Sequence, residues 1–228
     1  MKYESKLALG KARIKGKQKK DYLIRASHFN FYSCKYYSSH SEKMSLLRST
    51  TGTPINSYAP DFELPGVDEE VHHLSRYLEN YRAIAVIFMC NHCPYVKLYL
   101  NRLKELQADF QDRAVTLIGI NANDANQYPE DSFENMKNFA SENQLNFPYI
   151  RDVAQDVAES FGASKTPEVF LLDQDGRLRY KGLIDDNPDN SAAVQVSYLR
   201  TAIAQVIDSE SVNPSQTEAI GCSIKWRS

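Results

Sequence analysis

The sequence predicts an α/β domain in which a central mixed sheet is covered by helices on both faces. An apolar strand, residues 83–89, runs directly into an amphipathic helix; a second strand and helix follow; and two later strands form a hairpin. Strand–helix–strand crossovers are parallel and require helices packed on the sheet, whereas a hairpin is antiparallel. The order β-α-β-α-β-β-α therefore indicates a mixed sheet.

Each element rests on a local pattern. Residues 83–89 are apolar throughout, which suits a buried strand, and apolar residues recur at helical spacing from Pro94 to Phe110 with the proline in the first turn. The other predicted elements are a strand at 115–120, a helix at 132–142 capped by Ser132, a short helix at 156–161 ending at Gly162, a hairpin of 168–173 and 178–181 across an Asp-Gly turn, and a helix at 192–207.

Three regions divide the chain. Residues 1–48 hold 12 of the 27 Lys and Arg but only 3 of the 29 acids, which leaves 15 basic against 26 acidic residues in the remainder. We expect residues 1–43 to be a basic, disordered extension, residues 44–210 to be one domain, and residues 211–228 to be a tail. An acidic domain argues against nucleic acid as a partner, and no apolar stretch is long enough to span a membrane.

The cysteines are few and unevenly placed. Cys34, Cys90, Cys93 and Cys222 do not form the dense framework of a small secreted domain, and the first residues are basic without the apolar stretch of a secretory signal. We therefore expect a cytoplasmic protein, with organellar targeting by residues 1–43 as the alternative. Disulfides in the cytosol are more often catalytic than structural.

Cys90-Asn91-His92-Cys93 places two thiols at a strand-to-helix junction, where unpaired backbone N–H groups and the helix dipole stabilise a thiolate. We predict that Cys90 attacks a substrate disulfide and that Cys93, one turn further in, resolves the mixed disulfide. Pro94 supports the junction, and His92 tunes the thiolate. A zinc site is disfavoured because no second such pair exists, while two inert, buried cysteines remain the alternative.

The chain resembles the thioredoxin superfamily, and within it the redoxin branch related to alkyl hydroperoxide reductase and thiol-specific antioxidant proteins. The resemblance runs from about residue 59 to 207 through APDFELPG, FMCNHCPYVK and SKTPEVFLLD. It implies a thioredoxin fold with a redoxin-type N-terminal extension. It also implies that Thr166-Pro167 is a cis bond facing the active disulfide and presenting its backbone to an extended substrate.

Two departures from the family pattern bear on activity. Asn91-His92 replaces the Gly-Pro of thioredoxin, and a His before the second cysteine is similar to disulfide isomerases and oxidases, which implies a potential of about -180 to -120 mV. Aligning the peroxidatic cysteine of peroxiredoxins with Cys93 puts Val86 and Cys90 at the conserved Pro and Thr positions. A peroxidase pocket is therefore not evident.

The resulting prediction is a thiol–disulfide oxidoreductase that needs no cofactor and no metal. Its partners would be a protein or small thiol carrying a disulfide and an electron donor that the sequence does not identify; the oligomeric state is likewise left open. The alternatives are a thiol peroxidase, which would react rapidly with peroxide, and a binding module without turnover. Cys222, in the ending GCSIKW that also resembles this branch, is either a third redox thiol or a small buried apolar residue.

Overall fold

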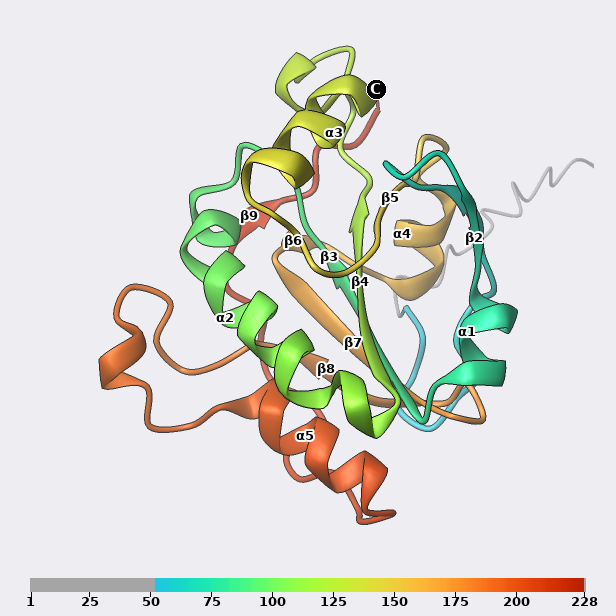
Figure 1. The fold of residues 1–228 in the computed structure, drawn as a ribbon, viewed down its shortest axis with the longest axis vertical. Coiled ribbons are helices and arrows are strands. Elements are labelled where there is room, and N and C mark those ends of the chain that lie inside the picture. Colours follow the sequence, from blue (N-terminus) through green and yellow to red (C-terminus); the bar gives the residue numbers. More distant parts are fainter. Residues whose placement is uncertain (1–51, 228) are drawn as a thin grey trace, which may run out of the picture. The chain divides into compact units, whose positions relative to one another are not determined.

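A computed structural model of the chain describes residues 52–227, so the predicted extension at 1–43 lies outside the described range. Its centre is a five-stranded sheet with the strand order β5-β4-β3-β7-β8 (Figure 1). Strand β3 (Ala83–Phe88) pairs in parallel with β4 (Val115–Asn121) and antiparallel with β7 (Glu168–Asp173). The predicted mixed α/β sheet is confirmed.

Further strands and helices surround this centre. The other strands are β1 (Glu63–Pro65), β2 (Val71–His73), β5 (Tyr149–Arg151), β6 (Lys165–Thr166), β8 (Leu178–Gly182) and β9 (Cys222–Ser223). The α-helices are α1 (Leu74–Asn80), α2 (Pro94–Phe110), α3 (Phe133–Glu142), α4 (Asp156–Phe161) and α5 (Tyr198–Ile207). Short 3-10 turns lie at Gln111–Arg113, Pro129–Asp131 and Ser191–Ala193.

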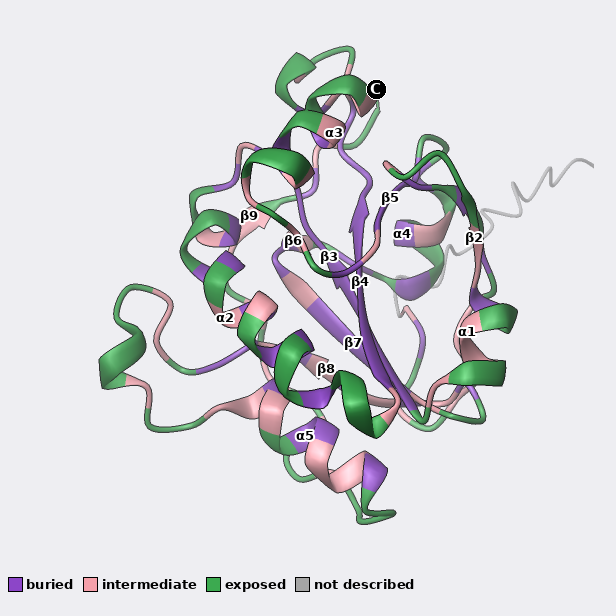
Figure 2. Cartoon of the chain, viewed as in Figure 1, coloured by how far each residue is buried: buried purple, intermediate pink, exposed green. Residues whose placement is uncertain are grey.

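Helices cover both faces of the sheet, as the sequence predicts. Alternate residues of β3 contribute to two apolar clusters: Ala85 packs with residues of α2, α3 and α5, whereas Val86 packs with residues of α1 and α4. Every residue of β3 is fully buried, and Figure 2 shows the same burial along the middle of the sheet. Burying each such branched side chain contributes about 1.5–3 kcal/mol, which accounts for the unbroken apolar run at 83–89.

Several elements differ from the sequence prediction. The helix predicted from residue 192 begins only at Tyr198, because the preceding segment is held in a loop: Asp186 N–H donates to the Val196 carbonyl, and Gln195 N–H donates to the Asp186 carboxylate. Strand β5 has only three residues, too few for a periodic signal, yet it pairs in parallel with β4. The segment predicted as a tail, residues 211–228, contacts the domain through the pairing of β9 with β6.

The fold brings three distant segments to the carboxyl end of β3. Cys90 to Cys93 connect this end to α2, the Pro129–Asp131 turn follows β4, and the chain crosses from β6 to β7 at Thr166-Pro167. The Thr166-Pro167 bond is cis, as the resemblance implies. Among residues 52–227, no helix combines the length and the apolar composition that a membrane span requires.

Candidate active site

The two predicted thiols meet helix α2 differently from the prediction. Cys93 is the N-cap residue, and the helix begins at Pro94. Cys90 therefore lies four residues before the first helical residue, in the loop after β3. Cys93 rather than Cys90 is placed where the unpaired N–H groups and the dipole of α2 act most strongly. Both cysteines are fully buried.

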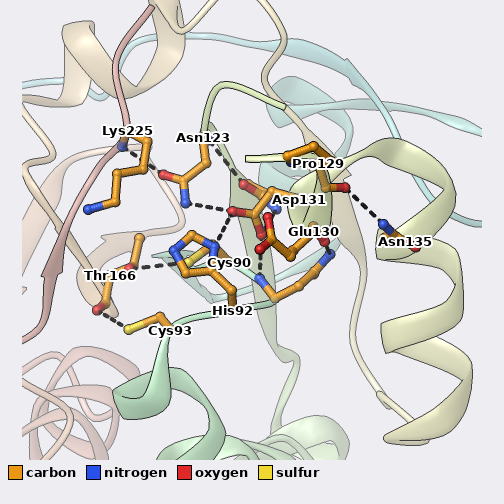
Figure 3. A network of polar contacts seen from close by, with 12 residues as sticks. Cys90, His92, Cys93, Asn123, Pro129, Glu130, Asp131, Asn135, Thr166 and Lys225 are labelled. Carbon is orange, nitrogen blue, oxygen red and sulfur yellow. Dashed lines mark hydrogen bonds and ion pairs between the residues drawn. The ribbon is translucent and has the colours of Figure 1, made fainter. Parts of the chain in front are cut away.

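The two residues between the cysteines are tied to the turn at Pro129–Asp131 (Figure 3). The Asn91 N–H donates to Asp131 Oδ1 over 2.7 Å, and the Asn91 side chain donates to the Glu130 carbonyl over 2.8 Å. His92 Nδ1 lies 2.6 Å from Asp131 Oδ2, while its ring stacks on Tyr128 at 5.5 Å between centroids. The loop that carries the thiols is thus held in one conformation by a segment about forty residues away.

Asp131 is the centre of this network, and its side chain is fully buried. Besides Asn91 and His92, its carboxylate accepts hydrogen bonds from Asn121 at 3.3 Å and from Asn123 at 2.8 Å. Four donors on two oxygens compensate for much of the cost of removing a carboxylate from water. A negative charge is therefore held beside Cys90.

Thr166, directly before the cis proline, contacts both thiols (Figure 3). Its hydroxyl lies 3.5 Å from Cys90 Sγ, and its carbonyl oxygen accepts a hydrogen bond from the Cys93 thiol over 3.0 Å. The loop between β6 and β7 thus covers the thiol pair from the side opposite Asp131.

The surroundings of the two thiols shift their pKa values in opposite directions. The pKa of Cys90 is raised well above its ordinary value by the adjacent Cys93, by burial and by the charge of Asp131. The pKa of Cys93 is lowered to about 4, chiefly by a hydrogen bond from the Cys90 thiol, with further contributions from the side chains of Thr166 and Cys222, although burial opposes the shift. These shifts favour ionisation of Cys93 before Cys90, whereas the hydrogen bond from the Cys93 thiol to the Thr166 carbonyl favours the protonated form of Cys93. The order of attack predicted from the motif, with Cys90 first, stays a prediction.

All of the site residues named from the sequence within the described range lie together. The structure brings together Cys90, Asn91, His92, Cys93, Pro94, Thr166, Pro167 and Cys222. Sequence reasoning missed Asp131 and Asn123. A signal for them existed, because Asn121 and Asn123 follow directly on an apolar strand, and polar residues at that end of a parallel strand commonly face a site.

Among the residues that the structure describes, one group of side chains has the spacing of a metal site. The ligand atoms of Cys90, His92 and Asp131 lie within 4.8 Å of one another. The carboxylate of Asp131 is already occupied by four donors, and the raised pKa of Cys90 disfavours the thiolate that zinc requires. Hydrogen bonding therefore accounts for this cluster without a metal.

A buried dithiol at the start of a helix, next to a cis proline at the same end of a mixed sheet, is typical of the thioredoxin-fold thiol–disulfide oxidoreductases. The chain belongs to the AhpC/TSA family, which matches residues 55–181. It is 26% identical over 134 residues to the thiol-disulfide oxidoreductase ResA of Geobacillus thermodenitrificans, a match that covers 57% of this chain and 69% of the relative.

Two solved structures have a similar fold. The structure of an uncharacterized conserved protein from Geobacillus kaustophilus is 39% identical, with a TM-score of 0.72 and coverage of 76% of this chain and 93% of that one. The thioredoxin domain of a thiol-disulfide oxidoreductase from Bacteroides vulgatus has 20% identity and a TM-score of 0.50, and it covers 58% of this chain and 90% of that one. The second comparison supports the fold alone.

Proposed function

We propose that the protein exchanges disulfides with a protein or small-thiol substrate through Cys90 and Cys93, and that Cys93 makes the first attack. The observation that carries the proposal is the asymmetry of the pair: Cys93 caps helix α2 and has a pKa lowered to about 4 by the Cys90 thiol, while Cys90 lies beside the buried carboxylate of Asp131. A dithiol in which one sulfur is ionised and the other protonated is suited to two successive exchange steps.

In the first step, the Cys93 thiolate attacks one sulfur of the substrate disulfide, so that a mixed disulfide forms and the other substrate sulfur leaves as a thiolate. In the second step, Cys90 gives up its proton and attacks Cys93 Sγ. The Cys90–Cys93 bond forms, the bond from Cys93 to the substrate breaks, and the substrate leaves with both of its sulfurs reduced. A ring nitrogen of His92 lies within 4.8 Å of Cys90 Sγ and is placed to receive the proton.

The same arrangement bears on the direction of exchange. A hydrogen-bonded thiolate stabilises the reduced form of the pair, and a more stable reduced form makes the disulfide a stronger oxidant. The lowered pKa of Cys93 thus supports a potential more oxidising than the roughly -270 mV of thioredoxin and agrees with the range of about -180 to -120 mV that the resemblance implies.

The test is a redox titration of the full chain in glutathione buffers, with thiols trapped by alkylation and counted by mass spectrometry. We expect one reversible two-electron transition between the dithiol and the Cys90–Cys93 disulfide. The variant Cys90→Ser/Cys222→Ser should lose this transition and accumulate a mixed disulfide on Cys93, whereas Cys34→Ser should titrate as the unchanged chain does. No transition in the unchanged chain would refute the proposal.

A thiol peroxidase is the second candidate, and one observation favours it: if the peroxidatic cysteine of the resembling family is aligned with Cys93, it falls on the thiol with the lowered pKa. Peroxide would oxidise Cys93 to a sulfenic acid and yield water or an alcohol, and Cys90 would condense with the sulfenic acid to release water. Consumption of peroxide by the reduced protein, followed with and without Cys93→Ser, separates this activity from disulfide exchange. Slow consumption that does not depend on Cys93 would exclude it.

A further inference from the structure

The C-terminal segment lies against the loop that would receive a substrate. Strand β9 (Cys222–Ser223) pairs antiparallel with β6 (Lys165–Thr166), with Cys222 opposite Thr166, and the Ile224 N–H donates to the Ser164 carbonyl over 3.0 Å. Figure 1 shows β9 beside β6, near the start of α2. An extended peptide that adds to an exposed strand edge binds through the same kind of main-chain pairing. The segment therefore occupies this edge as a docked peptide would.

The approach of this segment to the cis-proline loop is unusually close. A Cβ atom at Gly221 would lie 2.2 Å from the Thr166 carbonyl oxygen and 3.2 Å from the Pro167 nitrogen, so only glycine fits there. Further along, the Lys225 N–H donates to the Asn123 side chain over 2.9 Å, and Asn123 in turn donates to Asp131 (Figure 3). The segment is thus anchored on both sides of Cys222, once at the proline loop and once at the Asp131 network.

This anchoring puts a third thiol next to the active pair. Cys222 is partly buried and packs against the apolar cluster that contains Cys90 and Cys93. The side chain of Cys222 contributes to lowering the pKa of Cys93, and that of Cys93 contributes, after burial, to raising the pKa of Cys222 to about 11. A thiol on a docked strand, opposite Thr166 and packed against the cluster that holds the attacking sulfur, is in the position that a substrate cysteine must reach.

We propose that Cys222 is a third redox-active thiol, which resolves mixed disulfides on Cys93 in competition with Cys90. This inference rests on the proposed exchange function. The Cys222 thiolate attacks Cys93 Sγ of a mixed disulfide, the Cys93–Cys222 bond forms, and the bond between Cys93 and the substrate sulfur breaks. The substrate leaves as a thiolate, and the proton of Cys222 passes to solvent, so no external oxidant or reductant is consumed in the step.

The charge on Cys93 regulates this reaction. While Cys93 is a thiolate, its charge and its hydrogen bond help to keep Cys222 protonated; once Cys93 is part of a disulfide, both effects are lost, and Lys225 and Lys165 still favour the Cys222 thiolate. Cys222 therefore ionises more readily after Cys93 has reacted, although burial continues to raise its pKa. The tail acts as an internal substrate that can capture the disulfide when Cys90 does not.

The experiment uses the full chain with Cys34→Ser throughout, so that Cys34 cannot take part. The variant Cys90→Ser keeps Cys93 and Cys222, and the variant Cys90→Ser/Cys222→Ser keeps Cys93 alone. Each is reduced, freed of reductant and mixed with glutathione disulfide; the reaction is quenched with acid, and free thiols are alkylated. Intact mass and peptide mapping then distinguish a glutathione adduct on Cys93 from a Cys93–Cys222 disulfide.

We expect Cys90→Ser to form the Cys93–Cys222 disulfide and to hold at least roughly tenfold less glutathione adduct than Cys90→Ser/Cys222→Ser, because a tethered thiol acts at a high effective concentration. Replacing Cys222 by Ala should give the same adduct as replacing it by Ser. The role of Cys222 would be overturned if the two variants held equal amounts of glutathione adduct. The proposed function would remain intact if the Cys90–Cys93 pair still titrated reversibly in the chain that keeps both cysteines. No uptake of glutathione on Cys93 and no transition in the pair would overturn both.

Discussion

Whether Cys93 carries the thiolate can be measured in proteins that keep a single cysteine. The first protein combines Cys34→Ser, Cys90→Ser and Cys222→Ser and retains Cys93; the second has Cys93→Ser instead of Cys90→Ser and retains Cys90. Serine preserves a hydroxyl donor at position 90, so the hydrogen bond that contributes most to the lowered pKa of Cys93 remains possible.

The expected effect depends strongly on pH. With a pKa of about 4 against an ordinary value of 9.0, Cys93 is mostly ionised at about pH 5, whereas only about one ordinary thiol in ten thousand is ionised there. Lower basicity reduces the nucleophilicity of the thiolate by about two orders of magnitude over this range, because the Brønsted coefficient is about 0.4–0.5. Cys93 should therefore react about 50-fold faster than an ordinary thiol at about pH 5. At about pH 7 the two rates should be nearly equal.

The assay is the rate of reaction with dithiodipyridine across this pH range. The shape of the profile is the diagnostic quantity, because burial slows access to the sulfur at every pH alike. The Cys93-only protein should react at a nearly constant rate down to about pH 5, and the Cys90-only protein should slow about tenfold for each unit of falling pH. Exchanging Cys90→Ser for Cys90→Ala removes the donor and should move the bend of the Cys93 profile to higher pH.

The reverse result would refute the reasoning. If the Cys90-only protein reacts at a constant rate and the Cys93-only protein slows with falling pH, the thiolate forms on Cys90. The order of attack predicted from the motif, with Cys90 first, would then be correct, and the N-cap position of Cys93 would not control ionisation.

Three further predictions concern the free energy of unfolding, measured by urea denaturation. Asp131→Asn places an amide N–H₂ group opposite donors that now face a carboxylate oxygen, and it should lower the free energy of unfolding by about 2–4 kcal/mol. It should also lower the pKa of Cys90, because it removes a nearby negative charge. Leu103→Ala empties a fully buried position on α2 and should cost about 2–5 kcal/mol. Gly162→Ala should cost about 1–3 kcal/mol, because φ is +76° and the new Cβ would lie 2.3 Å from the Gly52 Cα.

Matched surface variants serve as controls for these measurements. Asp112→Asn and Leu98→Ala replace the same residue types at exposed positions and should change the free energy of unfolding by no more than about 0.5 kcal/mol. An Asp131→Asn protein as stable as its Asp112→Asn control would contradict the role assigned to the buried carboxylate. A Leu103→Ala protein no less stable than Leu98→Ala would contradict the packing of α2 on the sheet.

Much of the central fold could be predicted because its signals are local. The apolar run of β3, the helical spacing after Pro94 and the capping residue Ser132 each act over one or two turns of chain, and all three predictions agree with the structure. Ser132 Oγ accepts a hydrogen bond from the Asn135 N–H over 3.3 Å, as the capping prediction requires. The three-residue strand β5 escaped prediction because its order comes from pairing with β4 rather than from its own sequence.

The sequence by itself determined the chemistry of the site, since the spacing of Cys90 and Cys93 at the end of an apolar strand indicates a reactive dithiol wherever the rest of the chain lies. Only the tertiary structure shows which groups influence the ionisation of the two thiols, because the start of α2, the carboxylate of Asp131 and the thiol of Cys222 act on the pair through space. Asp131 and Cys222 are 38 and 129 residues beyond Cys93 in the printed sequence. Electrostatic and hydrogen-bonding effects depend on distances that sequence separation does not define, and folding alone makes those distances short.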